Sequence, residues 1–452
     1  MRTPSINNNK IAFSLVVIIT ITLIVDTSVA KIYYFSLSQS PVAPWRAFTF
    51  TLISSVSVIG LYFIRKFVKY KSETIRSRNA LHMNALHSVM TISQYVLMAF
   101  VLILVLEIIL IFLYNVLLLT LVIWTSYSTA VFMISVLAYR FFSWFRSKRN
   151  SVVLLYGISS AALGINAVFS VLFATVLLTD LPPYAVPHVG HENPFFILGG
   201  ATAILNSGYI TSTVLSFMLW WVATVFLLHH YSERARRKTY WIILGLPLVY
   251  FVVQFQPIFL DLFSSLLSSQ PVLFSTVYTL IFTLSKPVGG ILFGIAFWTI
   301  ARKLDANNPV RNYMMISAFG LVLIFVSDEA SALVSAPYPP FGVPTVSFMG
   351  LASYLVLVGI YSSAVSVAAD SRLRQSIRNY TLRESRLLDS IGMAQMGQEI
   401  ENKVMVLTEE NRERIEEETG IQSSLTEEDI KQYLEQVINE VKKQKAPADK
   451  KP

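Results

Sequence analysis

Long apolar runs separated by short polar segments make up most of the chain, and only its last part is patterned differently. A helix needs about 20 apolar residues to cross the hydrocarbon core of a bilayer, and about ten such runs occur before residue 370. We therefore predict an all-α fold, a polytopic transmembrane helix bundle with a short cytoplasmic helical tail. The predicted spans are residues 11–30, 47–64, 88–106, 117–139, 152–178, 209–228, 240–260, 274–300, 313–330 and 345–367.

The basic residues predict how these spans are oriented. Within residues 1–369, nineteen of the 22 Lys and Arg residues fall on one predicted side, whereas only Lys31 and Arg46 fall on the other and Lys286 lies inside a span. Short loops rich in Lys and Arg stay on the cytoplasmic side. We therefore predict a multi-pass protein of the cell (plasma) membrane with both termini in the cytoplasm.

Composition supports the bilayer as the partner of the bundle. The chain is 54% hydrophobic and 14% charged, whereas soluble domains carry about 25% charged residues. The net charge of +9 comes from the loops, because residues 1–369 hold 22 basic and 10 acidic residues and residues 370–452 hold 14 and 17. Membrane topology explains this charge, and no motif indicates nucleic-acid binding. The absence of cysteine excludes disulfides and thiolate metal sites.

The first predicted span has an alternative interpretation. Lys10, the apolar run 11–25 and Ser28-Val29-Ala30 also fit a secretory signal with a cleavage site. We favour an uncleaved first span, and cleavage would leave nine spans with the same orientation.

The Pro-rich segments 179–208 and 331–344 are predicted to be outer loops.

Lys286 is the strongest candidate for a ligand- or ion-binding residue. It lies near the middle of the eighth span, before Pro287 and a glycine pair, and a charge at the bilayer centre costs about 2.5–3.5 kcal/mol on insertion scales. A cation beside a broken helix is found at transporter binding sites. The alternative is a kinked helix whose Lys pairs with an acid on a neighbouring span. The Gly290–Gly294 spacing favours close helix packing.

The candidate partners of Lys286 are five acids within or near the outer ends of spans. Asp328 and Glu329 together end one apolar run, so they form either a helix end facing water or a site for a cation or proton. Glu107 is flanked by apolar residues on both sides. The five candidates are Asp26, Glu107, Asp261, Asp328 and Glu329.

A histidine cluster is the one candidate metal site. His188, His191 and Glu192 could bind a divalent cation through imidazoles and a carboxylate, although three ligands in a Pro-rich loop are a weak signal. The chain has no P-loop, dinucleotide-binding turn or other catalytic signature. We therefore predict no cofactor and a protein that is not an enzyme.

After the last span the pattern changes to a charged helix with one apolar stripe. Leu373, Ile377, Leu387 and Ile391 follow heptad spacing, which residues 396–407 roughly continue and Gly392 and Gly397 weaken. We predict a coiled-coil-like tail at 370–445, including a second helix near residues 426–441, and a disordered end at 446–452. Residues 373–407 would bind a cytoplasmic protein or a second copy of the chain.

The exit from the membrane resembles that of uncharacterised archaeal multi-span membrane proteins. The likeness extends over about 50 residues, and the run 354–377 and the segment 384–392 carry it. They resemble, more loosely, the connector helices of membrane sensor modules. The resemblance implies a sensor-like or scaffolding protein that relays a signal to a cytoplasmic partner. The alternatives are a solute or ion transporter with a site around Lys286, and an accessory subunit of a membrane complex.

Overall fold

The structure is a computed structural model, and it confirms an all-α membrane protein. It describes residues 5–36, 44–76, 80–179, 183–185, 201–228, 237–255, 269–304, 308–335, 338–370, 374 and 386–419. Within these ranges, nine helices are long and apolar enough to cross a membrane. The elements are α1 (Ser5–Ser36), α2 (Pro44–Arg76), α3 (Ala80–Ile111), β1 (Tyr114–Asn115), α4 (Val116–Ser147), α5 (Ser151–Thr179), β2 (Tyr184–Ala185), α6 (Ala201–Leu228), α8 (Arg237–Val253), α11 (Pro271–Phe282), α12 (Ser285–Lys303), α13 (Pro309–Ser327), α14 (Ala330–Ser335), α15 (Val343–Ser347), α16 (Met349–Ala369) and α18 (Arg386–Thr419).

Two predicted spans differ from the helices that form. The run 240–260 is represented by α8, whose apolar part, Tyr240–Val253, is shorter than the other spans. The run 274–300 becomes two helices, α11 and α12, separated at Thr283 and Leu284. The sequence also gave no sign of the short antiparallel ladder in which Tyr114 lies opposite Ala185 and Asn115 opposite Tyr184.

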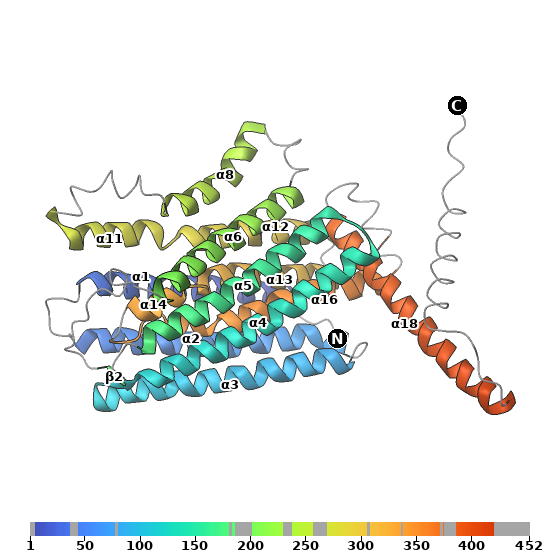
Figure 1. Cartoon of the computed structure of the whole chain (residues 1–452), viewed down its shortest axis with the longest axis horizontal. Helices are drawn as coiled ribbons and strands as arrows, with labels where there is room; N and C mark the ends of the chain where they lie inside the picture. Colours follow the sequence, from blue (N-terminus) through green and yellow to red (C-terminus); the bar gives the residue numbers. More distant parts are fainter. Residues whose placement is uncertain are drawn as a thin grey trace.

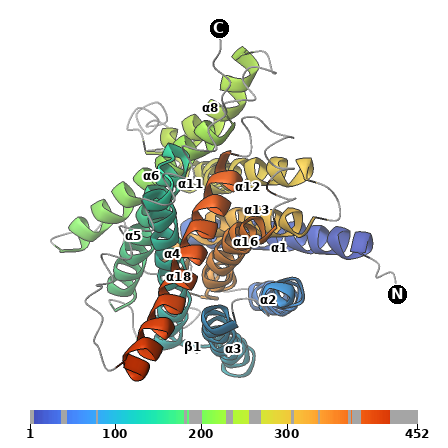
Figure 2. The ribbon, with the colours of Figure 1, turned by 90° about the vertical axis from the view of Figure 1, so that its right-hand side faces the viewer.

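The last span forms the centre of the bundle. In the span that begins in α15 and continues through α16, 100% of the most apolar stretch is buried within the protein, compared with 33% for α3. Figure 2, which looks along the bundle, places α16 among α13, α4 and α2. The α13–α16 contact is very close, because a methyl group on Gly359 would lie 2.6 Å from the carbonyl oxygen of Tyr313. Lipid-facing helices therefore surround a helix that touches only protein.

The Pro-rich segment between α13 and α16 is buried and partly helical, so the prediction that 331–344 is a loop without helix was wrong. Its described residues from Tyr338 to Ser347 are all buried, and two short helices, α14 and α15, lie within the segment. Irregular backbone that is buried away from solvent needs hydrogen-bond partners from the protein or from ordered water. Here the Ser126 hydroxyl donates to the carbonyl of Val346 at 2.6 Å, and the Tyr338 ring stacks on that of Tyr114.

The first turns of α18 pack against the end of the bundle. Leu387, Leu388 and Ile391 are each no more than 1% exposed, and the helix contacts α16, α4 and α5. A methyl group on Gly392 would lie 2.7 Å from the Cβ of Val367 in α16. The glycine that the sequence suggested would weaken the tail helix is therefore what allows its close approach to the bundle.

Polar contacts fix this docking at the α4–α5 connection. Four side-chain pairs join the two parts, three of them hydrogen bonds and one a salt bridge. They are Trp144 Nε1 to Gln395 Oε1 at 3.1 Å, Gln398 Nε2 to Ser143 Oγ at 2.7 Å, Asn150 Nδ2 to Ser390 Oγ at 2.6 Å, and Lys148 Nζ to Asp389 Oδ2 at 3.1 Å. Beyond these contacts α18 projects away from the bundle (Figure 1). The stripe through Leu387 and Ile391 thus has its partner within the same chain.

Candidate functional site

Lys286 lies at the start of a new helix inside a broken span. The chain leaves helical geometry at Thr283 and Leu284, and α12 begins at Ser285. Pro287 falls in the first turn of α12, where the missing N–H would have no helical partner in any case. The break predicted next to Lys286 is thus confirmed. It brings the ammonium group into the protein interior, with the residue 6% exposed.

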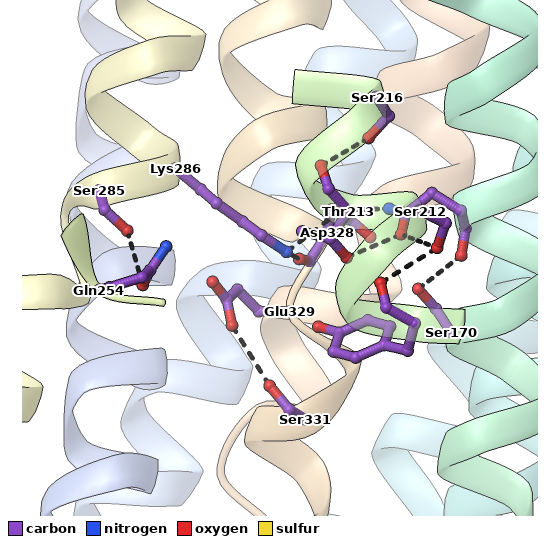
Figure 3. A network of polar contacts seen from close by, with 12 residues as sticks. Ser170, Ser212, Thr213, Ser216, Gln254, Ser285, Lys286, Asp328, Glu329 and Ser331 are labelled. Carbon is purple, nitrogen blue, oxygen red and sulfur yellow. Dashed lines mark hydrogen bonds and ion pairs between the residues drawn. The ribbon is translucent and has the colours of Figure 1, made fainter. Parts of the chain in front are cut away.

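Asp328 is the partner of Lys286. The ammonium nitrogen of Lys286 donates to the backbone carbonyl of Asp328 at 2.6 Å and lies 3.3 Å from its Oδ2. Figure 3 shows the Lys286 side chain extending from α12 to the residue that ends α13. The expectation that this lysine pairs with an acid next to a neighbouring span is confirmed. The alternative in which Asp328 faces water was wrong, because the residue is 2% exposed.

Asn166 on α5 links the ion pair to two further hydroxyls. Its Nδ2 donates to Asp328 Oδ2 at 2.8 Å. Its Oδ1 accepts from Ser212 Oγ at 3.1 Å and from Thr213 Oγ1 at 2.8 Å, both on α6. Asp328 Oδ2 therefore receives one charged donor, Lys286, and one neutral donor, Asn166. These contacts, with those of Asn166 to α6, join α5, α6, α12 and α13. Sequence reasoning missed Asn166, although an amide within an apolar span is itself a signal of a buried polar contact.

Glu329 pairs with a different helix from its neighbour Asp328. Its Oε2 lies 3.1 Å from Lys31 Nζ of α1, with side-chain exposures of 9% and 23% for Glu329 and Lys31. Burial raises the pKa of Glu329, but the ammonium groups of Lys31 and Lys286 outweigh that effect, so its pKa lies below the ordinary value of 4.5. A water-facing Glu329 is thus another wrong expectation. We call Lys31, Lys286, Asp328 and Glu329 the charged cluster.

The charged cluster is balanced in charge but not in hydrogen bonds. Two ammonium groups face two carboxylates, yet Asp328 Oδ1 and the hydroxyls of Ser327 and Tyr127 are buried without a hydrogen-bond partner among the described residues. The Lys286 nitrogen also lies 5.8 Å from the centre of the Tyr209 ring, a cation–π distance. The open positions are oxygens, so the arrangement can accept a further hydrogen-bond donor next to Asp328.

Asp26 lies outside the charged cluster and caps a helix. Its Oδ2 accepts from the backbone N–H of Gly342 at 3.0 Å and of Thr345 at 3.1 Å, and from the Thr345 hydroxyl at 2.7 Å. A carboxylate at a helix N-terminus satisfies amides that have no helical partner. Gly342, with φ of 96°, supplies the left-handed turn that leads into α15. Asp26 therefore fastens α1 to the buried segment rather than to Lys286.

Glu107 likewise has a local structural contact. Its Oε2 accepts from the backbone N–H of Asn115 at 2.9 Å, which closes the connection from α3 to α4. Asn115 in turn caps α4 by accepting from the Leu117 N–H. This contact holds the turn between the two spans and involves no member of the charged cluster.

The remaining sequence candidates fall outside the described residues. These are Asp261 and the proposed metal ligands His188, His191 and Glu192. Within the ranges that the structure covers, no group of three or more His, Cys, Asp or Glu residues is placed to hold a metal ion.

The fold and the site together define an integral membrane protein with a buried charged cluster and a docked tail helix. No protein-family model matches the chain, and no curated protein and no solved structure matches it. Inferences about its function therefore depend on the chain's own geometry.

Proposed function

We propose that the protein is a membrane sensor that relays a change at the charged cluster to its cytoplasmic tail. The observation that carries the proposal is the docking of α18 on α16, which itself packs along α13. Asp328 ends α13, so the cluster lies at one end of this helix series and the tail at the other. A ligand or ionic change that displaces Asp328 would shift α13 first.

Glycine contacts make the helix series suitable for transmission. A methyl group on Gly320 of α13 would lie 2.7 Å from Val356 Cγ2 of α16, and Gly392 of α18 approaches Val367 of α16 as closely. Packed interiors have little free space and convert small displacements into discrete repacking. A shift of α13 would therefore move α16 and loosen or tighten the docked turns of α18.

The proposal includes an orientation in the plasma membrane with both termini in the cytoplasm. Its support is the partition of Lys and Arg between the two sides. The salt bridge between Lys148 and Asp389 adds to this, because it brings the basic α4–α5 connection and the tail to the same end of the bundle. The tail would then be within reach of a cytoplasmic protein.

Cysteine labelling tests the relay directly, because the natural chain has no cysteine. Ala394, which is 1% exposed in the docked interface, is replaced by Cys in the full chain and its reaction with a water-soluble maleimide is timed. Adding Lys286→Met should speed the reaction several-fold, because a displaced α13 loosens the docking. Exposed Glu401→Cys is the matched control and should react at one rate in both backgrounds.

Two further variants separate relay from general damage. Ala130→Cys, at a fully buried position in α4, reports unfolding of the bundle and should stay unreactive with and without Lys286→Met. The conservative variant Lys286→Arg keeps a cation at this position. Combined with Ala394→Cys, it should preserve the slow labelling. Unchanged labelling of Ala394→Cys in the Lys286→Met background would refute the relay.

Transport is the second candidate, favoured by the position of Lys286 directly after the break between α11 and α12. Broken helices and a buried charge whose partner can exchange are features of alternating-access carriers. Truncation of residues 399–452 keeps the docked turns of α18 and separates the two functions. A transporter reconstituted in vesicles should keep its flux after truncation and lose it with Lys286→Met, whereas a relay would lose its output to a cytoplasmic partner.

A further inference from the structure

Helix α18 carries a second apolar stripe that does not face the bundle. The docked stripe contains Leu387, Ile391 and Ala394. The second stripe advances alternately by four and three residues, which is heptad spacing. At 3.6 residues per turn it lies about 130° around the helix from the docked stripe. We call it the free seam, and it consists of Ile400, Val404, Leu407 and Asn411.

The free seam is exposed where α18 leaves the bundle. Ile400 is 45% exposed and Leu407 is 57% exposed, and Val404 between them is half-buried. Figure 1 shows this half of α18 extending beyond the ends of the spanning helices. Because the docked stripe already contacts α16, the free seam points away from its own bundle. Apolar side chains at heptad spacing on a projecting helix are typical of a coiled-coil interface.

We propose that the free seam pairs with the same seam of a second copy of this chain in a parallel two-stranded coiled coil. With Val404 at position a and Leu407 at position d, the core has the β-branched and γ-branched residues that favour two strands. Asn411 occupies the next a position, where a single Asn fixes register and oligomeric state. The identity of the two seams gives a closed two-fold interface.

The flanking positions are compatible with this parallel register. In a parallel pair each g residue lies opposite the e′ residue five positions further on. Lys403 would therefore lie opposite Thr408, and Met396 opposite Glu401. No like charges meet at these flanks. The pairing thus costs no electrostatic repulsion at these flanks, and Arg414, at the next d position, marks the end of the seam.

Anchoring in the membrane adds stability that a seam of about two heptads lacks on its own. Short isolated helices are marginal in water, but two tails anchored in one bilayer have a high effective concentration. Copies inserted in the same orientation also present their tails at the same side and in the same direction. A parallel pair is therefore the arrangement that anchoring favours.

Single-cysteine cross-linking of the full chain in vesicles tests the proposal. Leu407→Cys lies at the centre of the free seam, and Asn402→Cys is an exposed control on the opposite face of the same helix. With a short bis-maleimide, Leu407→Cys should form a cross-linked dimer at least ten times faster than Asn402→Cys. Equal rates at the two positions would overturn the pairing.

A second variant keeps the test decisive if cysteine itself weakens the seam. Ile400→Glu with Val404→Glu should abolish cross-linking at Leu407→Cys, while slow labelling of Ala394→Cys shows that the docked face is intact. Cross-linking that survives the two glutamates would place the contact elsewhere and refute the seam. This dimer does not depend on the relay, because Leu407 reports on the free seam and Ala394 on the docked stripe.

Discussion

Replacing Lys286 by Met tests whether the charged cluster is held together as its geometry indicates. The change removes both contacts to Asp328, at 2.6 Å to the carbonyl oxygen and 3.3 Å to Oδ2. Asn166 remains as a donor to the carboxylate, at 2.8 Å. Leaving one member of a buried ion pair unpaired costs about 3–5 kcal/mol. We expect the free energy of unfolding to fall by that amount.

The assay is equilibrium unfolding of the purified protein in mixed detergent micelles, with a double variant as its reference. Lys286→Met with Asp328→Asn leaves no unpaired charge at this position and keeps a partner for Asn166, so most of the loss should be recovered. Lys31→Met is the matched control. Its side chain is 23% exposed, so Glu329 can recruit water and the loss should be less than half as large. A loss below about 1 kcal/mol for Lys286→Met, or no recovery in the double variant, would refute the reasoning.

Three further changes test other parts of the fold by the same unfolding measurement. Gly359→Ala should cost at least about 1–3 kcal/mol through overpacking against Tyr313, whereas Gly245→Ala, which meets no atom within 4 Å, should be neutral or stabilising by up to about 1 kcal/mol; equal effects would contradict the close α13–α16 contact. Asp26→Ala should cost about 1–3 kcal/mol by freeing the amides of Gly342 and Thr345, and Asp26→Asn should cost less. The pKa of Glu329 is lowered in the folded state, so its stabilising contribution is present above its ordinary pKa of 4.5 and is lost as the pH falls through the lower folded-state value. Glu329→Gln should remove this part of the acid sensitivity. An unchanged pH profile of the unfolding free energy would contradict a stabilising role of the Glu329 carboxylate.

Apolar runs in the sequence were enough to predict eight of the ten spans, but not the burial of the segment that joins α13 to α16. The Pro-rich run around Tyr338 has the composition of an exposed turn. The mean hydropathy of such a segment does not show whether water or protein surrounds it. The difference depends on Asp26 and Ser126, which supply partners for its backbone groups from helices far away in the sequence. Such pairings depend on the tertiary arrangement.

The same reasoning explains which members of the charged cluster were predicted. Lys286 and Asp328 stood out because a charge inside or at the end of an apolar run is rare and needs a partner. Lys31 was predicted to lie on the outer side of the membrane, and in the structure its side chain is 23% exposed and pairs with Glu329. Its pairing with Glu329 depends on where α1 lies relative to α13, and that relation has no local signature. Asn166 had a local signal, an amide within an apolar span, but its pairing with Asp328 depends on the same kind of tertiary relation.

The tail helix shows how a single apolar stripe can mislead. Heptad spacing indicates that a face is covered, but it does not say whether the cover is the same chain or another. In α18 the first stripe is covered by α16, α4 and α5, and the residues beyond Gly397 present a different face. A rigid helix that is docked on one side and free on the other couples the two surfaces. If α13 and α16 shift, the docked turns move, and the free seam changes its orientation toward any helix that it contacts.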